Sequence, residues 1–230
     1  MLAEYITECS KEKSIALMTH IICGYPSFED NRIILDEMER AQIDVVEMQF
    51  PFSEPIADGP VFAQANQVSI DNGTTTDQCF DFIAECSKKY SFKILMMGYY
   101  NTVFNRGEER FCKELQESGA VGMIIPDIPL EESAELRIYA DRYKVSMVQL
   151  IAPTSTPERI LQISNIANSS DTFVYAVARK GVTGKSTDMS TDIADYLKEI
   201  KKGLKKPLSV GFGIKSRADI EYLTGKADMA

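Results

Sequence analysis

Histidine and paired cysteines are scarce in this chain. The single histidine, His20, excludes most histidine-based metal sites and catalytic triads, and its apolar surroundings favour a partly buried strand residue over a catalytic one. The five cysteines are widely scattered and never stand as C-x-x-C. We therefore expect free thiols in a reducing compartment, with Cys79 and Cys86 packing into a core rather than doing chemistry.

Positive charge and long apolar runs are also lacking. With a net charge of −9, the chain offers no basic face to neutralise nucleic-acid phosphates, although a local pocket could still take a small phosphorylated ligand. No run approaches the ~18 apolar residues of a membrane span. Residues 1–14 carry acids and lack the long apolar core of a secretory signal. These absences predict a soluble, cytoplasmic protein.

Strand-length apolar runs and helical stretches do alternate along the 230 residues, of which 44% are hydrophobic. The predicted strands are 14–22, 44–48, 92–100, 121–127, 145–153, 172–178 and 207–213. The predicted helices are 28–42, 76–90, 108–119, 131–143, 156–167, 190–203 and 216–225. Residues 227–230 have the composition of the start of an eighth strand.

This alternation predicts an α/β fold with parallel strands and right-handed crossovers. Eight such units close into a (β/α)8 TIM barrel. A doubly wound open sheet is the competing fold, but it normally carries a G-x-G-x-x-G turn after its first strand, and "ICGYPS" (22–27) has none. No linker divides the chain, so we predict one barrel domain over residues 1–230, stopping at the start of strand eight.

Two carboxylates are the strongest candidates for catalysis, because barrel enzymes place their chemistry at the carboxyl ends of the strands. Glu47 interrupts the apolar strand "DVVEM", where burial would raise its pKa toward neutrality. A salt-bridged or solvent-facing acid is the alternative. Asp58 follows in a proline-restricted loop, where a turn-forming aspartate before Gly59 is the simpler interpretation. The case for catalysis is stronger for Glu47 and Asp58 together than for either alone, because two carboxylates in different surroundings can divide acid and base roles.

Two glycine-containing segments are candidates for phosphate binding. "KGVTGKST" (180–187) is not a P-loop, because only two residues separate its glycines. "GFG" (211–213) follows the seventh strand, and barrels often bind phosphate through backbone N–H groups after strands seven and eight.

These residues together resemble the alpha subunit of tryptophan synthase. The family pattern E-L-G-x-P-F-S-D-P-x-A-D-G-P is close to "EMQFPFSEPIADGP" (47–60), and Y-x-x-x-R-x-G-V-T-G is matched by "YAVARKGVTG" (175–184). "YYNTVFNRG" (99–107), "PDIPLEES" (126–133) and "VGFGIKS" (210–216) also look like family segments, in family order.

The resemblance implies a (β/α)8-barrel lyase that cleaves indole-3-glycerol phosphate to indole and glyceraldehyde 3-phosphate in tryptophan biosynthesis. It implies no cofactor in this chain. The expected partner is a beta subunit carrying PLP, in an alpha2beta2 complex, which receives the indole through a tunnel.

By the same resemblance, Glu47 is the catalytic acid and base at indole C3 and at the glycerol hydroxyl. Asp58 bonds the indole N–H, and Tyr175 lines the same pocket. The loops 52–60 and 179–190 are expected to close over the substrate. The substrate-binding residues implied by the resemblance are Tyr99, Asp127, Thr183, Gly184, Phe212 and Gly213.

Several positions depart from the family pattern. Gln49 replaces a glycine directly behind the catalytic strand, and Glu54 replaces an aspartate in the loop expected to face the partner. Ala178 stands where serine is common, and Lys180 where a small residue is common. The family's eighth strand, Gly-Ser phosphate segment and last helix would follow Ala230, so we expect the sequence to be incomplete there.

Two other functions compete with the lyase. An alpha-like barrel could chiefly bind and activate a beta subunit while cleaving poorly, which the changes at Gln49 and Glu54 would favour. Another phosphate-binding barrel enzyme is the second alternative. A Schiff-base aldolase is disfavoured, because no strand end offers an obvious lysine.

Overall fold

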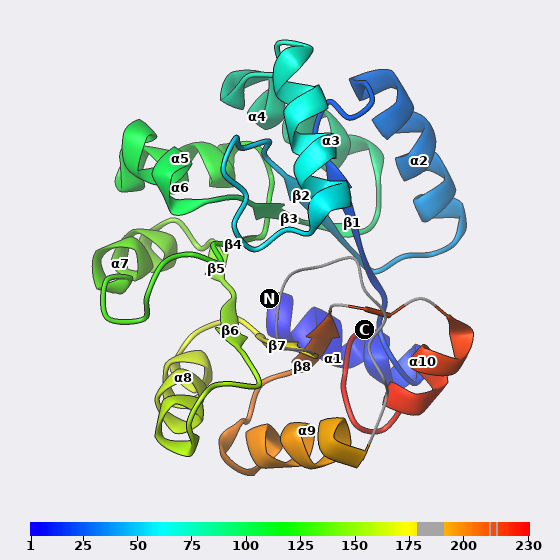
Figure 1. The fold of residues 1–230 in the computed structure, drawn as a ribbon, viewed down its shortest axis with the longest axis vertical. Coiled ribbons are helices and arrows are strands. Elements are labelled where there is room, and N and C mark those ends of the chain that lie inside the picture. Colours follow the sequence, from blue (N-terminus) through cyan, green and yellow to red (C-terminus); the bar gives the residue numbers. More distant parts are fainter. Residues whose placement is uncertain (179–190, 212, 215) are drawn as a thin grey trace. The chain divides into compact units, whose positions relative to one another are not determined.

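The computed structural model describes residues 1–178, 191–211, 213–214 and 216–230 (Figure 1). These residues form two compact units, one of Met18–Met147 and one of Met1–Leu17 with Val148–Ala230. The predicted organisation as a single domain stays a prediction. None of the helices in the described part is long and apolar enough to cross a membrane.

The Met18–Met147 unit contains a five-stranded parallel sheet in the order β1-β2-β3-β4-β5. Its register sets His20 beside Glu47 and Glu47 beside Leu95, so these three side chains share one face of the sheet. The strands are β1 (Met18–Ile22), β2 (Val45–Gln49), β3 (Lys93–Met97), β4 (Gly122–Ile124) and β5 (Ser146–Met147).

The opposite face of this sheet carries the core of the unit. Val46 and Met48 of β2 and Ile94 and Met96 of β3 are buried in one apolar cluster with residues from the flanking helices. Burying this surface is the main stabilising term for such a unit. The helices that contribute are α2 (Phe28–Arg40), α4 (Thr76–Lys89), α5 (Tyr100–Arg106), α6 (Glu108–Glu117) and α7 (Ala134–Arg142), which flank the strands in Figure 1.

Local sequence signals explain where several helices begin. Ser27 accepts a hydrogen bond from the Asp30 amide at the start of α2. Thr75 and Gln78 form a reciprocal capping box at the start of α4. Thr156 caps α8 (Pro157–Ser169), whose first residue is the proline favoured at that position.

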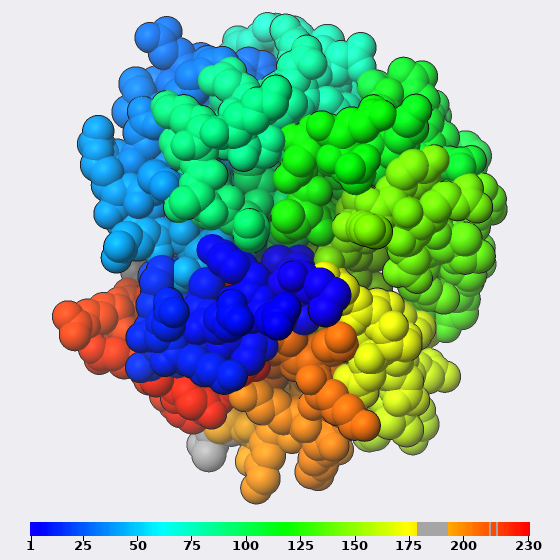
Figure 2. All heavy atoms as spheres, turned by 180° about the vertical axis from the view of Figure 1, so that it is seen from behind, coloured from blue at the N-terminus to red at the C-terminus, as the bar shows by residue number. Residues whose placement is uncertain are grey.

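The second unit contains a three-stranded parallel sheet, β6-β7-β8, made of Gln149–Ile151, Val174–Val177 and Leu208–Gly211. Met229 bridges Ala16 on one side and Ser209 on the other, which confirms the expected strand start at 227–230. The helices are α1 (Leu2–Lys13), α8, α9 (Thr191–Gly203) and α10 (Arg217–Leu223). Asp171 accepts hydrogen bonds from the Leu2 and Ala3 amides and so caps α1, whose atoms are among the dark-blue spheres of Figure 2.

The structure corrects the predicted elements in three places. Helices α1, α3 (Pro60–Asp71) and α5 (Tyr100–Arg106) were not predicted. The predicted strand 145–153 is two short segments, β5 and β6. The predicted strand 14–22 is regular only from Met18, and Ala16 makes an isolated bridge.

All five cysteines are free and buried. Burial raises the pKa of the Cys86 and Cys112 thiols to about 12, and a bond to the Cys79 thiol, with burial, raises that of Cys23. Thiols with such high pKa values carry almost no reactive thiolate near neutral pH. The packing role predicted for Cys79 and Cys86 is confirmed by their places in the apolar cluster.

Candidate active site

Glu47 is the one acid on the non-core face of β2. Its neighbours Val46 and Met48 are fully buried on the other face, while Glu47 itself is only partly buried. Among the described residues, no hydrogen bond or ion pair reaches its carboxyl group. The salt-bridged alternative for Glu47 is therefore not what this part of the structure contains.

Desolvation raises the pKa of Glu47 to about 8, and the negative charge of Asp58 adds to this shift. The group is therefore mostly protonated at neutral pH. A carboxylic acid with such a pKa can give up a proton and take one back near physiological pH.

This raised pKa predicts an unusual pH dependence of stability. Below its ordinary pKa of 4.5, Glu47 is protonated in both the folded and the unfolded chain and costs no stability. As the pH rises from 4.5 through about 8, the unfolded chain gives up this proton first, so the free energy of unfolding falls. Glu47→Gln should therefore raise the free energy of unfolding at pH 9 by about 1–3 kcal/mol, a value kept low because the side chain is only partly buried. Urea unfolding at several pH values measures it.

The difference between Glu47→Gln and the wild type should shrink as the pH falls toward 4.5. The exposed Glu54 is a matched control in the following loop, and Glu54→Gln should change stability by less than about 0.5 kcal/mol at every pH. Equal stability of Glu47→Gln and the wild type at pH 9 would contradict the raised pKa.

Asp58 lies in the loop between β2 and α3 and is held by three side chains. The Gln49 amide donates to its Oδ2 at 2.7 Å, and the Asn66 amide of α3 donates to the same oxygen at 3.3 Å. The Tyr99 hydroxyl also bonds its side chain. Burial raises the pKa of Asp58, and these three donors oppose that rise by stabilising the carboxylate.

Tyr99 supports the same loop from the end of β3. Its hydroxyl accepts a hydrogen bond from the Ala57 amide at 3.1 Å, and its ring stacks on Phe52 with centroids 5.2 Å apart. Burial raises the pKa of this phenol, so it stays a neutral donor. Tyr99 and Asp58 are thus brought together, while a role of Tyr99 in binding substrate stays a prediction.

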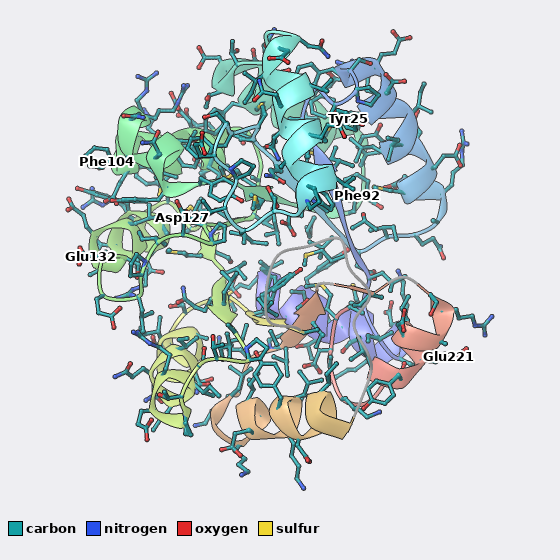
Figure 3. All side chains as sticks on the ribbon, in the orientation of Figure 1. Tyr25, Phe92, Phe104, Asp127, Glu132 and Glu221 are labelled. Carbon is teal, nitrogen blue, oxygen red and sulfur yellow. The ribbon has the colours of Figure 1, made fainter. Side chains whose placement is uncertain are left out.

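Asp127, labelled in Figure 3, lies after β4. Its Oδ1 accepts a hydrogen bond from the Tyr100 amide at 2.8 Å, at the first residue of α5. A carboxylate at a helix N-terminus is favoured by the helix dipole. The contact gives Asp127 a structural role, and its predicted role in substrate binding stays a prediction.

Tyr175 lies on β7 in the second unit and is partly buried. A Cβ atom built on Gly211 of β8 would overlap the Tyr175 hydroxyl and ring, so this tyrosine depends on glycine at position 211. Gly213 has φ of +86°, which glycine adopts without strain. The predicted residues Thr183, Gly184 and Phe212 lie outside the described residues.

The Gly211 contact predicts a local packing defect. Gly211→Ala should lower the free energy of unfolding by about 1–3 kcal/mol, because the Tyr175 ring must move. Thermal unfolding measures it. Gly203→Ala is the control, since a Cβ there meets only ordinary contacts, the nearest at 3.6 Å. Equal melting temperatures for the two variants would show that Tyr175 moves aside at no cost.

Sequence reasoning missed Asn66 and predicted the burial of His20 without its contacts in this site. Asn66 is fully buried, accepts from the Phe52 amide at 3.0 Å and donates to the Phe62 carbonyl at 2.9 Å. His20 lies on β1, partly buried as predicted, and stacks on the Phe62 ring with centroids 4.8 Å apart. Burial lowers the pKa of His20 to about 4, so its ring is neutral near pH 7. No local sequence pattern marks Asn66 as a buried residue.

The described residues contain no group of three histidine, cysteine, aspartate or glutamate side chains arranged to hold a metal ion.

The parallel strands joined by helices, with acids at and beyond a strand end, are typical of (β/α)8-barrel enzymes. A solved structure from Aquifex aeolicus VF5 matches at 31% identity and a TM-score of 0.90, covering 99% of this chain and 86% of its own. A structure of Mycobacterium tuberculosis tryptophan synthase matches at 26% identity and a TM-score of 0.89, again covering 99% of this chain and 86% of its own. The predicted fold class, an α/β (β/α)8 barrel, is confirmed.

A family model described as the tryptophan synthase alpha chain matches residues 6–230. The tryptophan synthase alpha chain of Desulfotalea psychrophila is 46% identical over 229 residues, covering 100% of this chain and 89% of the relative. The chain belongs to the tryptophan synthase alpha chain family. It is a lyase of tryptophan biosynthesis that cleaves indole-3-glycerol phosphate, and its family implies a beta-subunit partner.

Proposed function

We propose that Glu47 and Asp58 carry the cleavage of indole-3-glycerol phosphate as an acid–base group and an electrostatic partner. Protonation of indole C3 places positive charge on the ring nitrogen. Loss of the proton from the adjacent side-chain hydroxyl then forms the aldehyde, and the C3–carbon bond breaks. Its electron pair returns to the ring, which releases indole and glyceraldehyde 3-phosphate.

Glu47 suits both proton transfers in this proposal. In its protonated form it gives a proton to C3, and the resulting carboxylate takes the proton from the hydroxyl, so the group ends as it began. The observation that carries the proposal is its raised pKa of about 8 without any bonding partner among the described residues. An acid tied into an ion pair would lack both properties.

Asp58 suits the complementary role. We propose that it acts as a carboxylate that accepts the indole N–H and stabilises the positive charge that develops there, because its three donors stabilise the charged form against the rise in pKa that burial causes. Tyr175 is proposed to line the indole pocket, together with Tyr99 and Phe212. Asp127, Thr183, Gly184 and Gly213 are proposed to bind the rest of the substrate, including its phosphate.

The proposed assembly is an alpha2beta2 complex with a beta subunit that holds PLP and receives indole, in the cytoplasm. This chain itself is proposed to use no cofactor. Family membership supports the partner, and the chemistry above needs only proton transfers and charge stabilisation.

The deciding experiment is indole release from indole-3-glycerol phosphate by the protein, alone and with a matching beta subunit. We expect slow release alone and faster release in the complex. An absence of indole in both settings, with the beta subunit still activated, would overturn the proposal. It would leave the chain as a regulatory partner.

A further inference from the structure

Gln49 is buried and stands where the family pattern has glycine, so its side chain needs an explanation. Its Nε2 donates at 2.7 Å to Asp58 Oδ2 and at 3.3 Å to Asn66 Oδ1. The two amides therefore meet each other and the same carboxylate oxygen. The side chain has no exposed surface, so its polar atoms must find partners inside the protein.

The orientation of the Gln49 amide follows from these bonds. Because Nε2 faces a carboxylate, Oε1 must point the other way, and it has no partner in the structure. The Nε2 of His20 is also buried without a partner. His20 is paired with Glu47, and Gln49 lies two residues further along β2 on the same face of the sheet, so these two orphaned atoms are close enough in the fold to satisfy each other.

We propose that Gln49 is a positioning residue for Asp58: its Nε2, with Asn66, fixes Oδ2, so that Oδ1 faces the substrate N–H, while its Oε1 takes the Nε2–H of neutral His20. The replacement of glycine thus adds a support for the catalytic carboxylate instead of damaging the site. His20 acts through Gln49 and does not transfer a proton. The inference deepens the proposed function and rests on its role for Asp58.

Two neighbouring features fit this arrangement. Asn66 is held by the Phe52 amide and the Phe62 carbonyl, so it offers Asp58 and Gln49 a fixed partner. The His20 ring is held flat against Phe62, which limits its rotation. The Nε2 of Gln49 therefore meets a restrained side chain, and the proposed partner of its Oε1 is restrained as well.

The first test needs no substrate. The Asp58 carboxyl is titrated by ¹³C NMR in the whole protein, with its signal assigned through Asp58→Asn. Gln49→Met, which keeps the length and loses the donor, should raise the pKa of Asp58, and Gln49→Gly should do the same. Gln67→Met is the control, since Gln67 makes an equally short 2.7 Å bond to Asp71 on the surface and should leave the pKa of Asp58 unchanged.

The second test concerns His20 in the wild type. ¹⁵N NMR of the imidazole should find the neutral ring protonated on Nε2. A ring protonated on Nδ1, or an Asp58 titration unchanged in both Gln49 variants, would overturn the proposal. These measurements decide it even if the two variants differ in stability.

The catalytic test follows. Gln49→Met should lower the kcat of indole release by about tenfold, the value of one hydrogen bond to a charged group, with a smaller change in KM. Gln49→Asn cannot span the same distance and should behave like Gln49→Met. If the wild type releases no indole, the proposed function fails, while the two NMR titrations still decide the role of Gln49.

Discussion

Glu47→Gln should lower the kcat of indole release by about 10²- to 10⁴-fold, the usual contribution of a positioned general acid–base group. Glutamine keeps the size of the side chain and its place between His20 and Leu95, so the fold and the substrate pocket should survive. Since the same change stabilises the protein above pH 8, lost activity cannot be blamed on unfolding. Steady-state indole release, with melting temperatures recorded in parallel, measures both effects.

The dependence of kcat on pH, compared between the wild type and Glu47→Gln, tests the same role of Glu47. Because protonated Glu47 is the active form, wild-type kcat should fall as the pH rises through about 8. The residual activity of Glu47→Gln should lack that limb. Glu54→Gln, measured without the beta subunit, should retain both the rate and the limb. A variant at position 47 with wild-type kcat would remove Glu47 from the mechanism.

Asp58→Asn should lower kcat by about 10²- to 10³-fold, comparable to deleting one electrostatic contact to a transition-state charge. Asparagine is isosteric and neutral, so it cannot offset the positive charge on the indole ring. The loss should be larger in kcat than in KM, because that charge is absent from the bound substrate. Single-turnover measurements separate the two.

The same variant should also change Glu47. The Asp58 charge raises the pKa of Glu47, so removing it should move the high-pH limb of the residual activity below 8. Asp71→Asn, which removes an exposed carboxylate from α3, is the control and should leave the limb in place. An unmoved limb in Asp58→Asn would mean that the two acids do not interact.

The alternation of apolar runs was enough to predict most strands and helices. Glu47 stood out because it is the one charged residue inside the apolar run Val45–Met48. The missed helices have physical reasons. The apolar period of α3 is broken by the buried polar residues Asn66 and Ser69, and α5 has only 7 residues, too few for a period to appear.

The supports of the site were harder to predict than its acids. The pairing of His20 with Glu47 depends on the register of two strands separated by a helix, and no local pattern contains it. The bond from Gln49 to Asp58 depends on how the loop turns back onto β2. Sequence reasoning treated Gln49 as a defect, because a family pattern records which residue is usual and not which contact a replacement can make.

The buried thiols also bear on how this molecule can be observed. Each native cysteine is buried, and burial raises the pKa of Cys86 and Cys112 to about 12, so maleimide reagents should not react with any of the five at neutral pH. A single cysteine introduced on the exposed face of the 52–60 loop, for instance at Ser53, would then be the only reactive sulfur. The protein can therefore carry a fluorescent reporter on the loop that contains Asp58 without removal of its own cysteines.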